Sequence, residues 1–245
     1  MPTLHLQLCA GFANRVRAMI SGICLAEDLN ANLVLHWFPR SVECVCSLKS
    51  VLDPESLPKT CKVVPDELYN PVEVLSPEDL NRFFHRWDKT SDIEIKSYGI
   101  FYTNERWEEH LRRLRPSPMV KEVLERRTAL VDWPTAIGVH IRRTDNKKSI
   151  EGSPLESFLK KMREDMESTY VIATDDKEVR KQLEEEFVGR CFFPSFVLSR
   201  RTEEGMIHGA ADFFALSKCS QIWGSYASSY SEIASRYGNN LLTIV

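Results

Sequence analysis

The segment from Thr135 to Asp145 constrains the fold most, because an apolar run rich in β-branched residues ends there in two adjacent arginines. In α/β proteins, ligands bind in the crevice outside the carboxyl ends of the parallel strands. A guanidinium is always charged and grips phosphate oxygens through two parallel hydrogen bonds. The segment therefore predicts a diphosphate site at the end of a strand, and with it a nucleotide or nucleotide-sugar enzyme.

Apolar periodicity predicts alternating strands and helices along much of the chain. In the first half we expect a strand at 3–9, a helix at 15–30 and a strand at 32–37. Prolines interrupt the stretch 38–134, which we expect to form loops and short helices, with helices at 104–115 and 117–128. In the second half we expect strands at 135–141, 169–173, 192–198, 221–224 and 241–245, and helices at 154–167, 177–187, 205–218 and 228–237. This pattern predicts an α/β protein with two Rossmann-like lobes, residues 1–132 and 133–245, facing a central cleft.

Composition and charge exclude several classes of function. A net charge of −3 supplies no basic field for nucleic acid or an anionic membrane. No apolar run approaches the roughly 18 residues of a membrane helix, and the N-terminal residues lack the regions of a signal peptide. We therefore expect no nucleic-acid partner, no membrane span and a cytoplasmic location, or the Golgi or ER lumen if the chain is truncated.

The seven cysteines are an odd number, and Cys9, Cys24 and Cys219 lie in apolar patterns where a reduced thiol packs as a small hydrophobe. Cys44 and Cys46 lack the two-residue gap of zinc knuckles. We favour buried free thiols in a reducing compartment over metal ligands. A secreted fold with one disulfide is the alternative.

Polar residues follow three of the expected strands. Arg142 and Arg143 should point to different sides of their strand, so that one clamps a diphosphate while the other supports the lobe; the alternative is a surface pair in salt bridges. Asp175 or Asp176 either reads a nucleoside or caps a helix. The segment 224–231 opens a helix whose positive end and serine hydroxyls form an anion site, with simple capping as the competing interpretation.

An early turn, Gly11 to Arg15, also joins a strand to a helix. It lacks the full glycine pattern of a dinucleotide site, and Asn14 could serve only as the N-cap of the helix.

Taken in chain order, these pieces resemble the fucosyltransferase superfamily that holds the α1,2-, α1,6- and protein O-fucosyltransferases. The matching pieces are Gly11 to Arg15, His140 to Asp145, Ala173 to Asp176, and Ala211 to Cys219 together with 224–231. The resemblance implies a GT-B fold with the donor bound mainly by the C-terminal lobe. It also implies GDP-β-L-fucose as donor, inversion at the sugar carbon, a glycan or glycoprotein acceptor, and no metal or other cofactor.

The resemblance further implies roles for single residues. Arg142 matches the arginine that holds the β-phosphate and stabilises the leaving GDP. The other matches are His140 and Asp212 at guanosine, Ser228, Ser229 and Tyr230 at the diphosphate, and Asn14 near the transferred sugar. Tyr230 stands where phenylalanine is common.

The general base is expected to be a carboxylate within hydrogen-bond reach of the acceptor hydroxyl. Glu151 lies close to where the α1,6 branch places a catalytic glutamate, one residue out of step, and Asp145 is the alternative. A different donor, such as GDP-rhamnose or UDP-xylose, and a non-catalytic nucleotide- or carbohydrate-binding module are the competing functions.

Overall fold

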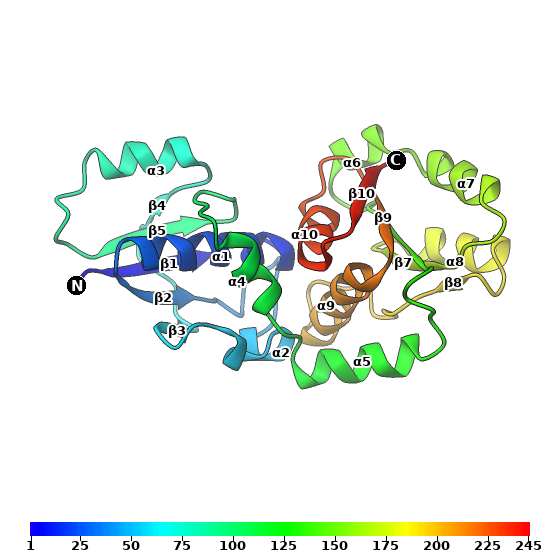
Figure 1. The fold of residues 1–245 in the computed structure, drawn as a ribbon, viewed down its shortest axis with the longest axis horizontal. Helices are drawn as coiled ribbons and strands as arrows, with labels where there is room; N and C mark the ends of the chain where they lie inside the picture. Colours follow the sequence, from blue (N-terminus) through cyan, green and yellow to red (C-terminus); the bar gives the residue numbers. More distant parts are fainter. The chain divides into compact units, whose positions relative to one another are not determined.

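Both halves of the chain are built on an all-parallel, five-stranded sheet. The computed structural model describes residues 1–245, which divide into two compact units. Unit 1 comprises Met1–Ser117 with Arg200–Glu203, and unit 2 comprises Pro118–Ser199 with Glu204–Val245. Figure 1 shows the elements of unit 1 in blue to green and most of those of unit 2 in green to red.

Unit 1 has the strand order β3-β2-β1-β5-β4, so its first strand lies in the middle of the sheet. Leu4 and Leu6 of that strand are fully buried. The first helix packs closely on this strand at Gly22, where a Cβ would lie 2.4 Å from Leu6 Cδ2 and the leucine side chain would have to shift. The strands are β1 (Thr3–Leu8), β2 (Asn32–His36), β3 (Cys61–Val64), β4 (Val72–Glu73) and β5 (Ile93–Ser97). The helices are α1 (Phe12–Asp28), α2 (Leu48–Val51), the 3-10 helix η1 (Pro54–Ser56), α3 (Pro77–Phe84) and α4 (Trp107–Arg113).

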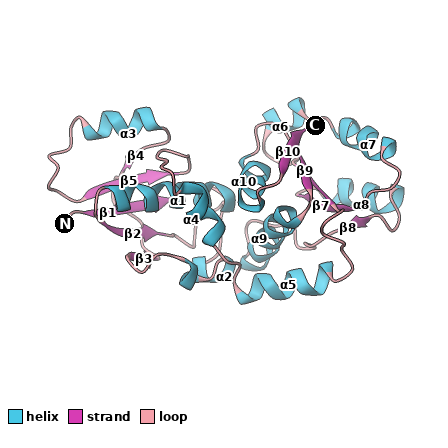
Figure 2. Cartoon of the chain, viewed as in Figure 1, coloured by secondary structure: helices cyan, strands magenta, loops and turns pink.

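Unit 2 has the strand order β10-β9-β6-β7-β8, with helices alternating with strands along the chain (Figure 2). All residues of its central strand, β6 (Ile137–Ile141), are buried, as expected for a strand covered on both faces. The other strands are β7 (Tyr170–Thr174), β8 (Cys191–Phe192), β9 (Gln221–Gly224) and β10 (Leu241–Ile244). The helices are α5 (Pro118–Thr128), α6 (Lys147–Gly152), α7 (Leu155–Glu164), α8 (Lys177–Glu186), α9 (Glu203–Lys218) and α10 (Ser229–Gly238).

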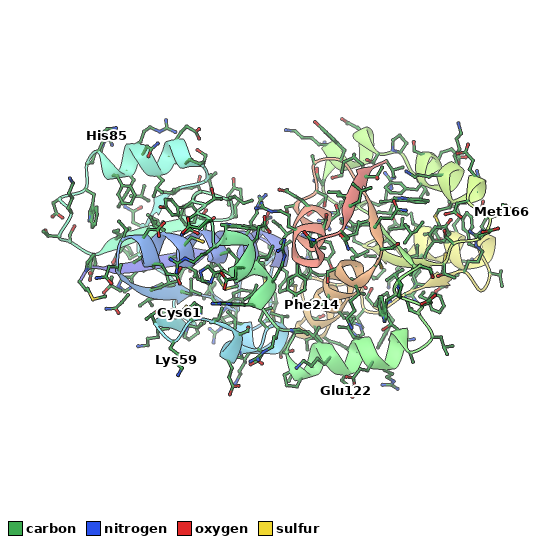
Figure 3. All side chains as sticks on the ribbon, viewed as in Figure 1. Lys59, Cys61, His85, Glu122, Met166 and Phe214 are labelled. Atoms are coloured by element: carbon green, nitrogen blue, oxygen red, sulfur yellow. The ribbon has the colours of Figure 1, made fainter.

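In the sheet of unit 2, the order in which the chain adds strands reverses beside β6. Strands β7 and β8 follow on one side of β6, and β9 and β10 then add to the other side. Such a reversal opens a crevice outside the carboxyl ends of the two strands that flank it, here β6 and β9. The core behind them is aromatic: Phe214, labelled in Figure 3, packs its ring 5.3 Å from Phe213 and 5.2 Å from Tyr237.

The structure confirms the α/β class and most of the predicted elements, with differences at particular places. The stretch 38–134 holds β3, β4 and β5 in addition to loops, so the prediction of loops and helices alone was wrong there. The strand expected at 192–198 ends at Phe192, since Pro194 cannot donate to a sheet ladder. The compact units divide at Ser117, whereas the sequence predicts a lobe boundary at Asp132; the roles of the two lobes stay predictions.

All seven cysteines are free thiols, and Cys24 and Cys219 are buried. Cys44 Sγ and Cys46 Sγ lie 3.7 Å apart. No three or more His, Cys, Asp or Glu side chains gather where they could hold a metal ion. None of the helices combines the length and the apolarity that crossing a membrane requires.

Candidate functional site

The polar residues of unit 2 meet at the carboxyl ends of β6, β7 and β9. The register pairs Ile141 of β6 with Thr174 of β7, so the next residues, Arg142 and Asp175, leave the sheet side by side. On the other side of β6, His140 pairs with Gly224 at the end of β9. The site therefore forms at the reversal point of the sheet, where the topology predicts a ligand.

Arg142 is held at this edge by its backbone and by its side chain. Its amide donates to Ser225 Oγ at 3.0 Å, and that hydroxyl donates to the His140 carbonyl at 3.1 Å. The guanidinium is paired with two carboxylates: Nη1 lies 2.6 Å from Asp175 Oδ2, and Nη2 bonds to Asp145. With its side chain 18% exposed, Arg142 is a largely buried cation that still reaches solvent.

Arg143 contacts different partners from Arg142, although both arginines follow Ile141, the last residue of β6, so strand alternation does not apply to them. Its guanidinium donates to the carbonyls of Ile150 at 3.3 Å and Ser153 at 2.5 Å. Burial lowers the pKa of this guanidinium from its ordinary value. Arg143 thus fastens the end of α6 to the sheet, which favours the supporting role over contact with a ligand.

For Asp175 and Asp176 the sequence left open two roles, a helix cap and a contact with a nucleoside, and the structure distinguishes the two residues. Asp176 caps α8 by accepting from the amides of Glu178 at 2.8 Å and Val179 at 3.0 Å. Asp175 instead accepts from the Arg143 amide at 2.7 Å and from Thr144 Oγ1 at 2.6 Å, in addition to its pair with Arg142. Both oxygens of Asp175 are therefore engaged by the protein itself.

The segment between β9 and α10 is fixed from the side of α6. Asn146 Nδ2 donates to the Ala227 carbonyl at 3.0 Å, and Ser149 Oγ donates to the Tyr226 carbonyl at 2.7 Å. Ala227 has a left-handed backbone (φ 51°), which redirects the chain into α10. Ser228 is the N-cap residue, but its side chain makes no capping hydrogen bond. The positive end of the α10 dipole is thus presented at the same edge of the sheet as Arg142.

A buried aromatic and acidic cluster lies behind Arg142. The His140 ring packs 4.9 Å from the Tyr230 ring, and the Tyr230 hydroxyl donates to the Gly209 carbonyl. Asp212 on α9 accepts from the Ser195 amide at 3.0 Å. Apart from its chain neighbours and the backbone of α9 itself, no atom lies within 4 Å of the place where a Cβ on Gly209 would stand, so there is open space beside this glycine.

Burial sets the protonation of this cluster. Desolvation, reinforced by the charge of Arg142, lowers the pKa of His140 to about 4, and its Nδ1 has no hydrogen-bond partner. Desolvation raises the pKa of Asp212 to about 7 and that of Tyr230 well above its usual value. At neutral pH the cluster therefore contains a neutral imidazole whose Nδ1 has no hydrogen-bond partner. It also contains a carboxyl group whose pKa is close to 7. Such groups are suitable for hydrogen bonding to the edge of a heterocycle.

Two other predicted site residues lie in different surroundings. Helix α1 begins at Phe12 with Gly11 as N-cap, so Asn14 lies in its first turn and is not its cap. Asn14 belongs to unit 1, apart from the residues just described. Glu151 lies in α6 with an exposed side chain. Of the two candidate bases, Asp145 is the one in contact with Arg142.

The sequence interpretation included Ser225 only among the serine donors of the segment 224–231, and it missed that this serine joins the ends of β6 and β9. Its position directly after a predicted strand was a usable signal, but its full burial was not visible in the sequence. Ser153 was missed as well: its carbonyl binds Arg143, and its hydroxyl accepts from the Tyr226 amide at 2.8 Å.

We expect Asp212 and His140 to shift stability with pH in opposite directions. The raised pKa of Asp212 means that the native state binds more protons between about pH 4 and pH 7, so its contribution to stability is lost as pH rises through that window. The lowered pKa of His140 makes stability rise with pH between about 4 and 6.5. Asp212→Asn removes only the first effect.

The free energy of unfolding of Asp212→Asn, measured relative to the unsubstituted protein, should therefore increase from about pH 4 to pH 7 by up to about 4 kcal/mol, since one pKa unit is worth about 1.4 kcal/mol. Urea unfolding across this range checks the result. A difference that does not change with pH would show that Asp212 ionises normally.

The sequence matches no family model and no curated protein. Solved structures do match. The NodZ α-1,6-fucosyltransferase co-crystallised with GDP has a TM-score of 0.67 at 14% identity, with 96% of this chain and 92% of that chain covered; another NodZ structure is from Bradyrhizobium. POFUT1 in complex with GDP has a TM-score of 0.60 at 12% identity, covering 99% and 98%. A mutant of Arabidopsis thaliana FUT1 with GDP has a TM-score of 0.68 at 11% identity, covering 100% and 70%.

These proteins share their fold with the chain over nearly its whole length, and they match the two parallel sheets described above. The chain thus has the GT-B fold of these structures.

Proposed function

We propose that this protein transfers L-fucose from GDP-β-L-fucose to a hydroxyl group of a glycan or glycoprotein, with inversion at the sugar carbon and without a metal ion. The observation that carries the proposal is the position of Arg142, a fixed guanidinium at the reversal point of the unit 2 sheet and on the same edge as the start of α10. The seven free thiols suit a reducing compartment such as the cytoplasm.

Arg142 supports the chemical step. As the bond from the sugar to the nucleotide breaks, negative charge grows on the leaving diphosphate, and a donor already aimed at that charge lowers the barrier. The guanidinium is permanently charged and is oriented by Asp175, so it needs little rearrangement when the charge appears. Ser228, Ser229 and Tyr230 lie at the start of α10, where backbone amides and the helix dipole favour the same anion.

The buried cluster behind Arg142 supports a guanine nucleotide. Guanine presents two neighbouring N–H donors, at N1 and at the amino group, which one carboxylate can accept together. Asp212 fits this requirement when it ionises, and the unused Nδ1 of His140 supplies a further polar contact. Structures of NodZ and POFUT1 contain GDP or GDP-fucose, in line with this assignment.

Fewer residues can be assigned to the acceptor side of the reaction. We assign the general base to Asp145 or Glu151, of which Asp145 already lies at Arg142. Asn14 in unit 1 is assigned to the transferred sugar. Arg143 and Asp175 act by holding the donor site together. Both Asp175 oxygens and the Nη1 and Nη2 groups of Arg143 bind other groups of the protein, whereas the buried Nε of Arg143 has no hydrogen-bond partner.

The test is a calorimetric and thermal-shift titration of the full chain with GDP, UDP, ADP and GDP-fucose, each with EDTA and with Mg²⁺. We expect GDP and GDP-fucose to bind, equally well under both conditions. A preference for UDP would indicate a different donor, for example UDP-xylose. The absence of any nucleotide response from folded protein would favour a non-catalytic module.

A further inference from the structure

Two buried thiols of unit 1 lie in contact and take no part in the proposed function. Cys44 Sγ and Cys46 Sγ are 3.7 Å apart, and the two residues are separated by a single position in the chain. We propose that a peroxide oxidises this pair to a disulfide, and that the disulfide weakens the packing of Arg15 in the first turn of α1. The proposal does not depend on the proposed function.

The charge beside the pair favours a thiolate and disfavours a metal ion. Arg15 is 1% exposed, and its hydrogen bonds all go to neutral acceptors, the Ala10 and Phe38 carbonyls and Ser41 Oγ. Its guanidinium interacts electrostatically with Cys44. A thiolate at Cys44 therefore gives this buried cation a negative partner, whereas a cation bound between the two sulfurs would be repelled.

The two thiols differ in acidity. The hydrogen bond with Cys46 and the charge of Arg15 lower the pKa of Cys44, although burial and the charge of Glu43 oppose this effect. The same hydrogen bond, together with burial, raises the pKa of Cys46. Burial also raises the pKa of each of the other five cysteines. Cys44 is thus the nucleophile of the pair, and Cys46 keeps its proton until it attacks.

An exposed turn covers Cys44. Ser41 and Cys44 form an isolated bridge, in which the Cys44 amide donates to the Ser41 carbonyl at 3.2 Å. Between them, Val42 is 75% exposed and Glu43 is exposed as well. Exposed turns open locally at a small cost in free energy. Hydrogen peroxide is close in size to water, so a small opening of this turn admits it to the sulfur.

The oxidation requires only the two thiols and one peroxide molecule. The Cys44 thiolate attacks one peroxide oxygen, the O–O bond breaks, and the other oxygen leaves as hydroxide and is protonated to water. The Cys46 sulfur then attacks the sulfenic acid on Cys44, the S–O bond breaks, and the hydroxyl leaves as water with the Cys46 proton. Two electrons pass from the thiols to the peroxide, which becomes two waters.

Disulfide formation changes the surroundings of Arg15 in two ways. It removes the negative charge from Cys44, so that a buried guanidinium is left with neutral partners. It also draws the sulfurs from 3.7 Å to about 2 Å apart, in a segment fixed by Arg15 at Ser41 and by Trp37 Nε1 at the Cys46 carbonyl. Because so short a ring restricts the unfolded chain little, it does not compensate these losses. The oxidised protein should therefore melt about 5 °C lower.

The experiment treats the full chain with hydrogen peroxide, removes the excess with catalase, alkylates under denaturing conditions and digests with trypsin. Cleavage after Arg40 and Lys49 leaves both cysteines in one peptide, residues 41–49. We expect this peptide to lose two hydrogen atoms and to escape alkylation, about tenfold faster than any other cysteine is oxidised. Dithiothreitol should restore both thiols and the melting temperature.

Single variants separate the two thiols. In Cys46→Ser, oxidation should stop at a sulfenic acid on Cys44, which dimedone labels. In Cys44→Ser, the Cys46 thiol should stay reduced and peroxide should leave the melting temperature unchanged. Cys61→Ser is the matched control, because it removes a partly exposed lone thiol of the same unit. Its peptide 41–49 should be oxidised as in the unsubstituted protein.

The proposal is overturned if peptide 41–49 stays fully alkylated, or if it is oxidised no faster than the lone cysteines. Dimedone on Cys46 of Cys44→Ser, at the rate seen for Cys44 in Cys46→Ser, would contradict the assignment of the nucleophile. A disulfide that leaves the melting temperature unchanged, or raises it, would exclude the effect on Arg15. None of these results involves a nucleotide, so they leave the test of the proposed function unaffected.

Discussion

Arg142→Ala is expected to lower kcat with GDP-fucose by a factor on the order of 10² to 10³ while the protein stays folded. The substitution removes the one guanidinium that two carboxylates hold at the carboxyl end of β6. Its effect falls on the departing diphosphate, whose negative charge grows as the bond to the sugar breaks. Asp175 keeps the Arg143 amide and the Thr144 hydroxyl as partners, so the loop retains its anchor.

Steady-state kinetics and a thermal melt of the same samples separate turnover from stability. Arg163→Ala is the matched control, since Arg163 also pairs with two carboxylates, Glu156 and Glu186, away from the strand ends. Its kcat should be unchanged. The kcat of Arg142→Lys should lie between those of Arg142→Ala and the unsubstituted protein, because lysine keeps the charge but lacks the planar guanidinium that forms two parallel hydrogen bonds. If Arg142→Ala kept turnover within a few-fold of the unsubstituted protein, the proposed mechanism would be wrong.

Arg15→Met should reduce the free energy of unfolding by about 3 kcal/mol. Arg15 is 1% exposed and lies in the first turn of α1, shortly after the end of β1. It donates to the carbonyls of Ala10 at 3.0 Å and Phe38 at 3.1 Å and to Ser41 Oγ at 2.9 Å, with its guanidinium 4.9 Å from the Trp37 ring centroid. Methionine fills much of the volume but leaves these buried acceptors unpaired.

Urea unfolding measures the change. Arg40→Met, at an exposed arginine near the same turn, should stay within about 0.5 kcal/mol of the unsubstituted protein. A loss below about 1 kcal/mol for Arg15→Met would show that water or a rearranged loop satisfies the carbonyls. The expected loss identifies the arginine of the Gly11 to Arg15 turn as a structural residue.

The sequence predicted the fold best where strands are long and buried. Strands β1, β2, β6, β7 and β9 appear as apolar runs between turn signals, and they were found to within about two residues, the usual uncertainty of an element boundary. Strand β4 has only two residues, both exposed, and its pairing with β5 depends on residues distant in sequence. Strand β5 alternates in burial and carried a usable signal, which the charged residues in and around the strand obscured.

The site shows the same division between local and distant information. Arg142 and Arg143 have different partners, but strand alternation cannot explain this, because β6 ends at Ile141 and both arginines lie in the loop that follows. That Asp175 binds Arg142 follows from the register between β6 and β7, which no local pattern specifies. The pKa shifts of His140 and Asp212 depend on burial by α9, α10 and the segment around Ser195, so composition could not predict them.

The parallel sheet of unit 2 also determines at which stage of folding the candidate site forms. Asp175 and Ser225 reach Arg142 only after the chain has completed the crossovers to β7 and β9. Such long-range parallel pairing forms slowly, because loop-closure entropy is lost before the contacts compensate it. A ribosome-bound or partly unfolded chain therefore has no site for a nucleotide. A nucleotide bound as proposed would therefore stabilise only chains in which this sheet is complete.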